Sequence, residues 1–85
     1  MKLNGCKKIT DIGIISLSLS ETLIMLNIAH CNKINDIGLI ALKTCKMLTY
    51  VCITINANMT HSIIESLMKI VHKKKNDLNL LDEFI

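Results

Sequence analysis

The sequence repeats itself almost letter for letter at an interval of 25 residues. Residues 31–39 read CNKINDIGL, and residues 6–14 read CKKITDIGI. Apolar residues also correspond beyond this segment: Leu17 with Leu42, Leu23 with Leu48, Leu26 with Val51 and Ile28 with Ile53. A degraded third copy pairs Asn56 with Cys31, Met59 with Ile34, Ile64 with Leu39 and Leu67 with Leu42. Since one such short unit cannot bury its own apolar side, the copies are expected to stack around a shared core.

Each copy is predicted to contain a short strand, a turn, a helix and a return loop. In the second copy we expect a strand at about 25–29, because Leu26 and Ile28 alternate with residues that can face outward. A helix is expected from about residue 36 to residue 45. Asp36 or the preceding Asn35 is its expected N-terminal cap, and Thr10 or Asp11 would cap the helix of the first copy.

The end of the chain is expected to depart from this plan. The helix of the third copy should run to about His72, and the three consecutive lysines at 73–75 are read as a solvated loop or helix end. Residues 77–81, DLNLL, would then form a final strand, and residues 82–85 a partial cap. We therefore divide the chain into repeats at 1–72 and a loop, strand and cap at 73–85.

The copies resemble the cysteine-containing leucine-rich repeat. Residues 23–31, LIMLNIAHC, fit the general pattern L-x-x-L-x-L-x-x-N/C at every fixed position. Residues 34–45, INDIGLIALKTC, resemble the I-T-D-x-G-L-x-x-L-a-x-x-C element of the subtype. The resemblance covers about residues 1–70. It implies an α/β solenoid of about three repeats of 25 residues, with short parallel strands on the concave side and helices on the convex side.

The same resemblance implies a class of function. Repeats of this subtype are typical of F-box proteins, in which they receive substrates for a cullin-based ubiquitin ligase, and of scaffolds in cilia, mitosis and mitochondria. Because Met1 aligns with Leu26 and Leu3 with Ile28, the chain opens in the middle of a repeat. We expect either a fragment of a longer protein or a subunit that stacks on another chain, rather than a mispredicted gene start.

Composition argues against specific nucleic-acid binding. The net charge is +3, but all ten cations are lysines and only one Tyr and one Phe are present. Nucleic-acid sites usually combine clustered cations with planar groups that stack on bases. A membrane span is not expected either, since the apolar stretch at 12–32 is interrupted by Glu21 and several Ser, Thr and Asn residues. The N-terminus lacks the uninterrupted apolar segment of a secretory signal.

No residue pattern points to catalysis, a metal or a cofactor, so the chain is not expected to be an enzyme. The cysteines Cys6, Cys31, Cys45 and Cys52 lack the close pairs of a zinc site, and the first two occupy equivalent positions of successive copies. The first three are read as packing residues, whereas Cys52 falls on the outward row of its strand and could be an exposed thiol. Unpaired cysteines suit a reducing, intracellular compartment, such as cytoplasm or nucleus, with cilium or mitochondrion as further options. His30, His61 and His72 lie beside expected turns or helix ends, with no recurring nucleophile or carboxylate.

Two surfaces could carry function. On the strands, the outward positions are Met25, Asn27, Ala29, Tyr50, Cys52 and Thr54, preceded by Lys2 and Asn4. Tyr50 is the aromatic residue among them, and Tyr is enriched among interface hot spots. On the helices, positions that are usually polar in the repeat pattern are isoleucines: Ile12, Ile15, Ile37 and Ile40. We expect these four to form an exposed ridge, which ends where Ser62 and Glu65 take the same positions.

The leading hypothesis is a non-enzymatic protein–protein interaction module. Its most specific form is the substrate receptor of an F-box type ubiquitin ligase adaptor, with the Skp1–cullin machinery as partner if an F-box lies outside this chain. The alternative is a structural subunit of a large ciliary, mitochondrial or other assembly.

Overall fold

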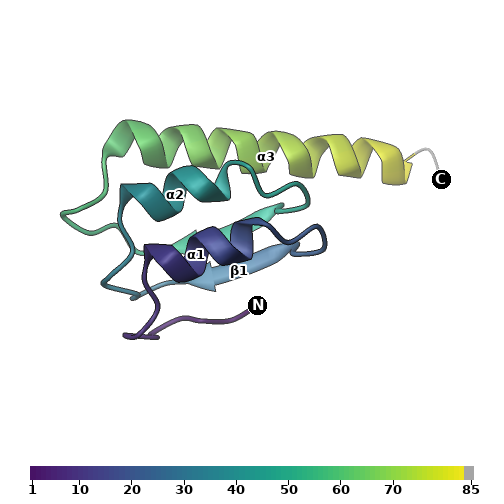
Figure 1. Ribbon diagram of the computed structural model, residues 1–85. Coiled ribbons are helices and arrows are strands. Elements are labelled where there is room, and N and C mark those ends of the chain that lie inside the picture. The colour runs from purple at the N-terminus through teal and green to yellow at the C-terminus, as the bar shows by residue number, and fades with distance from the viewer. Residues whose placement is uncertain (84–85) are drawn as a thin grey trace.

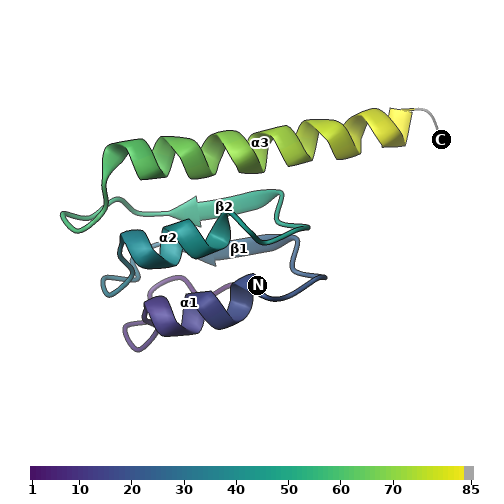
Figure 2. The same cartoon turned by 45° about the horizontal axis from the view of Figure 1, so that its top comes forward.

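The computed structural model describes residues 1–83, which form three helices and two strands (Figure 1). Their order is α1 (Asp11–Ser18), β1 (Met25–Ile28), α2 (Asp36–Leu42), β2 (Tyr50–Ile53) and α3 (His61–Glu83). The helices lie side by side in one layer and the strands lie in a second layer behind them, as the two views together show (Figure 2). The architecture is therefore a small two-layer α/β unit.

The sheet consists of β1 and β2 in parallel, with Met25 opposite Tyr50 and Ile28 opposite Ile53. The N-terminal segment adds a single bridge, between Lys2 and Asn27. The main-chain N–H of Leu3 donates to the carbonyl of Asn27 at 2.7 Å, and the N–H of Asn27 donates to the carbonyl of Met1 at 2.9 Å. Three chain segments thus lie side by side on the sheet, although only two of them are strands.

The core lies between the two layers and is almost entirely aliphatic. Residues with no exposed surface are Ile14, Leu26, Ile34, Leu39, Leu42, Cys45, Leu48 and Leu67. Cys31 is also buried, and its thiol donates to the carbonyl of Leu3 at 3.1 Å. The side-chain amide of Asn56, which corresponds to Cys31 in the next copy, donates to the carbonyl of Ile34 at 3.1 Å. In both copies, the side chain at this position donates a hydrogen bond to a main-chain carbonyl of an earlier segment.

The aspartates at the start of α1 and α2 bind the following copy instead of capping their own helices. Thr10 and Asn35 stand at the N-cap positions as expected, but neither makes a side-chain capping bond. Asp11 Oδ1 instead accepts the N–H of Asn35 at 2.8 Å. Asp36 Oδ1 accepts the N–H of Thr60 at 2.6 Å, and its carboxylate also accepts the Thr60 hydroxyl. The expected capping role of these aspartates is therefore wrong.

Gly38 is the residue that leaves room for one of these links. A Cβ atom at Gly38 would lie 2.6 Å from Asp11 Oδ1 and 3.3 Å from a methyl group of Ile34. These distances are shorter than contact distances, so a larger residue would displace the Asp11 carboxylate from the turn before α2.

The prediction of a leucine-rich-repeat solenoid is wrong. A solenoid needs every unit to return the chain to a new parallel strand, whereas residues 1–83 form two strands and make that return once, from β1 to β2. After the turn at 56–60 the chain enters α3 and continues as helix for 23 residues. The unit is a compact α/β arrangement of three helices on two parallel strands.

The expected lysine-rich loop and final strand are also wrong, because residues 73–83 belong to α3. Lysine is a good helix former, and 67–83 contains no Gly, Pro, Ser or Thr to end the helix. In α1 and just after α2, by contrast, hydroxyl groups compete for helix carbonyls: Ser18 donates to Ile15 at 2.6 Å and Thr44 to Ala41 at 2.7 Å. The expected partial cap at 82–85 lies partly outside the described residues, which exclude 84 and 85.

α3 is tied to the rest of the molecule along its first part, as far as Lys74. Ile64, Leu67 and Val71 are buried in the core, and the ammonium group of Lys74 donates to the carbonyl of Cys45. Although α3 is long, no helix among the described residues combines the length and apolarity that crossing a bilayer requires.

Candidate protein-binding surface

The outer face of the sheet carries large apolar side chains that the fold leaves uncovered. Met25 on β1 is 53% exposed and its neighbour Tyr50 on β2 is 47% exposed. The next residue along each strand, Leu26 or Val51, faces the core and is buried. The alternation of a half-covered sheet therefore places a methionine and the tyrosine side by side in solvent.

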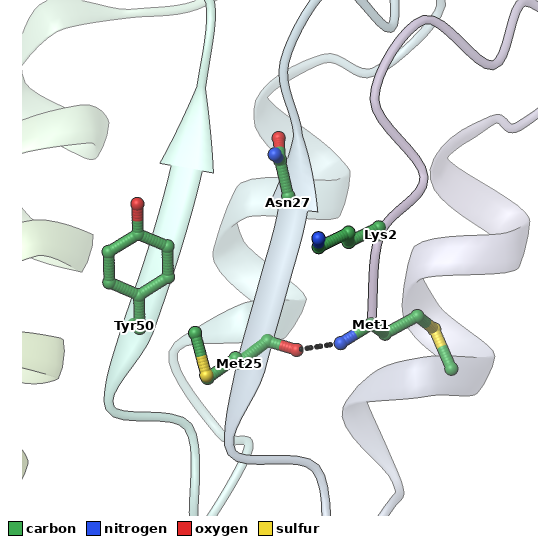
Figure 3. Close-up of a pocket in the computed structure, with 5 residues that line it drawn as sticks. All are labelled: Met1, Lys2, Met25, Asn27 and Tyr50. Carbon is green, nitrogen blue, oxygen red and sulfur yellow. Dashed lines mark hydrogen bonds between the residues drawn. The ribbon is translucent and has the colours of Figure 1, made fainter.

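These two residues belong to a hollow of about 260 Å³ on the sheet face (Figure 3). Its lining residues come from three adjacent segments and are Met1, Lys2, Met25, Asn27 and Tyr50. Figure 3 shows the Met25 thioether extending toward the Tyr50 ring and Lys2 lying beside Asn27. The hollow thus has an apolar floor, and an ammonium and an amide group lie beside it.

Hydrogen bonds hold the base of the hollow in place. The Met1 ammonium donates to the carbonyl of Met25 at 2.8 Å. The Asn27 side chain accepts the N–H of Ala29 at 3.1 Å through Oδ1, which fixes the amide against the strand end. These two bonds fix the Met1 main chain and the Asn27 side chain within the lining.

Of the six strand residues predicted for binding, three line this hollow and three do not. Met25, Asn27 and Tyr50 are brought together. Ala29 and Cys52 are half-buried, and Thr54 is exposed but uses its hydroxyl to accept the N–H of His30 at 3.1 Å. Lys2 joins the site through its bridge to Asn27.

A second hollow of about 270 Å³ lies beside the first, between β2 and α3. Its lining residues are Thr49, Tyr50, Val51, Met68, Val71, His72 and Lys75. Tyr50 lines both hollows, so the two adjoin at this residue. The α3 residues of this hollow are spaced three or four positions apart and so lie on one face of the helix. This helical spacing is the sequence pattern from which they could have been predicted to lie together.

The isoleucine ridge, Ile12, Ile15, Ile37 and Ile40, lies on the opposite layer, on α1 and α2. Ile12 is 77% exposed, Ile37 62%, Ile40 47% and Ile15 40%. On α3 the equivalent Ser62 and Glu65 are exposed and polar, and Glu65 Oε1 lies 3.2 Å from His61 Nε2. No hollow described for this structure includes a ridge residue.

Several polar side chains of the described residues bind the main chain of the protein itself. The hydroxyl of Thr60, together with its main-chain N–H, holds the pKa of Asp36 below its ordinary value. Among the side chains that the structure describes, no group of three or more His, Cys, Asp or Glu is placed to hold a metal ion. All four cysteines are free thiols, with Cys31 and Cys45 buried.

Comparison of the chain with protein-family models, curated proteins and solved structures finds no match. Its function is therefore argued from its surfaces.

Proposed function

We propose that the chain is a non-enzymatic protein-interaction module that binds a protein partner on the outer face of its sheet. The observation that carries the proposal is the hollow at Tyr50, which is lined by the exposed side chains of Tyr50 and Met25. Tyrosine is enriched among interface hot spots, and methionine adapts its shape to different partners. The fold has no internal need to leave these two side chains exposed together.

A more specific version is reception of substrates for an F-box type ubiquitin ligase. Its support is the resemblance of residues 34–45 to the repeat found in such proteins. This version predicts that Skp1-like and cullin subunits accompany the chain in cells.

The second candidate is a structural subunit of a large assembly, and the isoleucine ridge favours it. Four exposed isoleucines on adjacent helices form an apolar surface of the kind that is commonly covered by a neighbour. A protruding aliphatic surface without a hollow suits permanent packing better than selective capture of a ligand.

Affinity purification of the tagged chain from its native cells tests these alternatives. Three forms are compared: the natural chain, Tyr50→Ala with Met25→Ala, and Ile37→Asp with Ile40→Asp. All four positions are exposed, so each form should fold. We expect the sheet-face variant to lose the partner and the ridge variant to keep it.

Two results would contradict the proposal. Retention of every partner by the sheet-face variant would exclude that surface. Loss of the partner from the ridge variant alone, together with recovery of a fixed set of structural subunits, would favour the assembly role.

A further inference from the structure

The two hollows beside Tyr50 adjoin at this residue, which lines both of them. The first is lined from the N-terminal segment, β1 and β2, and the second from β2 and α3. Each is smaller than the roughly 300–1,000 Å³ of pockets that hold drug-sized ligands. Two small adjacent hollows fit successive apolar side chains of one peptide better than they fit a whole cofactor.

The charged side chains that line the two hollows are those of Lys2 and Lys75. Lys2 lies at one end, and His72 and Lys75 lie at the other, on α3. No acidic side chain is among the described residues that line either hollow. The apolar centre, formed by Met25, Tyr50 and Met68, is thus flanked by cationic groups at both ends.

From this arrangement we infer the chemical class of the partner segment. It is a short peptide with two apolar side chains in the centre and acidic residues on both sides, and it lies across the strands from Lys2 to Lys75. The apolar side chains enter the hollows on either side of the Tyr50 ring. The flanking carboxylates meet the lysines, which increases the association rate and selects against basic sequences. This inference rests on the proposed function.

The dimensions are consistent with a peptide of this length. Lys2 and Tyr50 lie on segments two strand spacings apart, about 10 Å, and three to four extended residues cover that distance. Reaching Lys75 on α3 requires a few residues more, so about six to eight residues span the surface.

The composition of the molecule favours an acidic peptide over nucleic acid. Both carry negative charge, but stacking on bases needs aromatic platforms, and Tyr50 is the one aromatic side chain that lines these hollows. The remaining apolar side chains are methionines and two valines, which suit aliphatic side chains instead.

Fluorescence anisotropy with defined probes tests the inference. The probe is a labelled peptide of sequence EDLLDE, and the control probes are EDSSDE, KKLLKK and a single-stranded oligothymidine. We expect EDLLDE to bind and the three control probes to bind at least about tenfold more weakly, with the affinity for EDLLDE falling as salt rises. Equal binding of KKLLKK or tighter binding of the oligothymidine would overturn the acidic–apolar assignment.

Matched variants locate the binding. Lys2→Glu with Lys75→Glu should weaken binding of EDLLDE by about tenfold or more, since two attractions become repulsions. Lys33→Glu changes an exposed lysine that lines neither hollow and should leave the affinity within about twofold. Methyl NMR should show shifts at Met25 and Met68 on addition of the peptide, with Ile37 unchanged.

Failure of the inference can be distinguished from failure of the proposed function. If EDLLDE does not bind, or if the double lysine variant binds it normally, the inferred chemistry is wrong. The proposed function still stands in that case when Tyr50→Ala with Met25→Ala removes the natural partner from the purified chain.

Discussion

The sheet face and the helix face both expose large apolar side chains, but they differ in shape and in surrounding charge. On the sheet face, Met25 and Tyr50 lie over a hollow that Lys2 and Asn27 also line. On the helix face, Ile12 and Ile37 are exposed and line none of the hollows described above. The difference indicates two kinds of contact: a polar-lined hollow can discriminate between ligands, whereas an aliphatic ridge mainly provides area to bury.

The largest expected effect is on the free energy of unfolding, and it distinguishes a core residue of α2 from a ridge residue of the same helix. Leu39 has no exposed surface, whereas Ile37 on the same helix is 62% exposed. Leu39→Ala should lower the free energy of unfolding by about 2–5 kcal/mol, and Ile37→Ala by less than about 0.5 kcal/mol. Urea denaturation followed by circular dichroism measures both. A loss above about 1 kcal/mol for Ile37→Ala would mean that the ridge serves the fold itself.

Methionine oxidation should weaken binding on the sheet face and leave the ridge chemically unchanged. Met1 and Met25 are about half exposed, whereas the other methionines are more covered. Mild peroxide should convert these two to sulfoxides first and weaken partner binding by about tenfold, because a polar group replaces the apolar floor. Mass spectrometry and a binding titration give the two readouts. Met1→Leu with Met25→Leu is the control, and the comparison fails if this variant is equally sensitive to peroxide.

A third prediction changes stability without touching either surface. His30 has a φ angle of 60°, a left-handed conformation that is unfavourable for residues other than glycine. Gly5, at the equivalent position of the first copy, has a φ angle of 75°. His30→Gly should therefore raise the free energy of unfolding by up to about 1 kcal/mol, and Gly5→Ala should lower it by about 1 kcal/mol. Thermal and urea unfolding measure the changes. Partner affinity should remain the same in both variants, and a parallel change in affinity would show that the two properties are coupled.

The smallest expected effect concerns the link between α2 and the start of α3. The Thr60 hydroxyl and N–H lower the pKa of Asp36 below 3.8 in the folded chain. A lowered pKa contributes stability above the unfolded value, and this contribution disappears as pH falls through the folded value. The difference in stability between the natural chain and Asp36→Asn should therefore shrink as pH falls from about 5 to below about 3.5. Urea midpoints across this range measure it, and a difference that stays constant with pH would contradict the assignment.

Local patterns in the sequence predicted the first half of the fold well. The strand expected at about 25–29 is β1, at Met25–Ile28, and the helix expected at about 36–45 is α2, at Asp36–Leu42. Both follow from apolar periodicity, which reports directly which side chains face the core. The role of Asp36 was not predictable in the same way, because its partner Thr60 lies 24 residues ahead and is brought near by the fold.

The prediction for the C-terminal part is wrong because the repeat pattern of the earlier copies does not hold there. That pattern predicts a loop at residues 73–75, although nothing near them ends a helix. The error also concealed part of the candidate site. Lys75 reaches the second hollow because α3 continues past His72. The sheet-face row was predictable from strand alternation, whereas the hollow between β2 and α3 depends on how two distant segments pack.

Site-specific photo-crosslinking tests the central claim most directly. The photoreactive amino acid p-benzoylphenylalanine is placed at Tyr50 in one sample and at Ile37 in another, and both chains are irradiated in native cells. Binding on the sheet face predicts a defined crosslinked protein from position 50, which is lost on adding Met25→Glu, and none of that protein from position 37. The same protein crosslinked from position 37 and absent from position 50 would contradict the account.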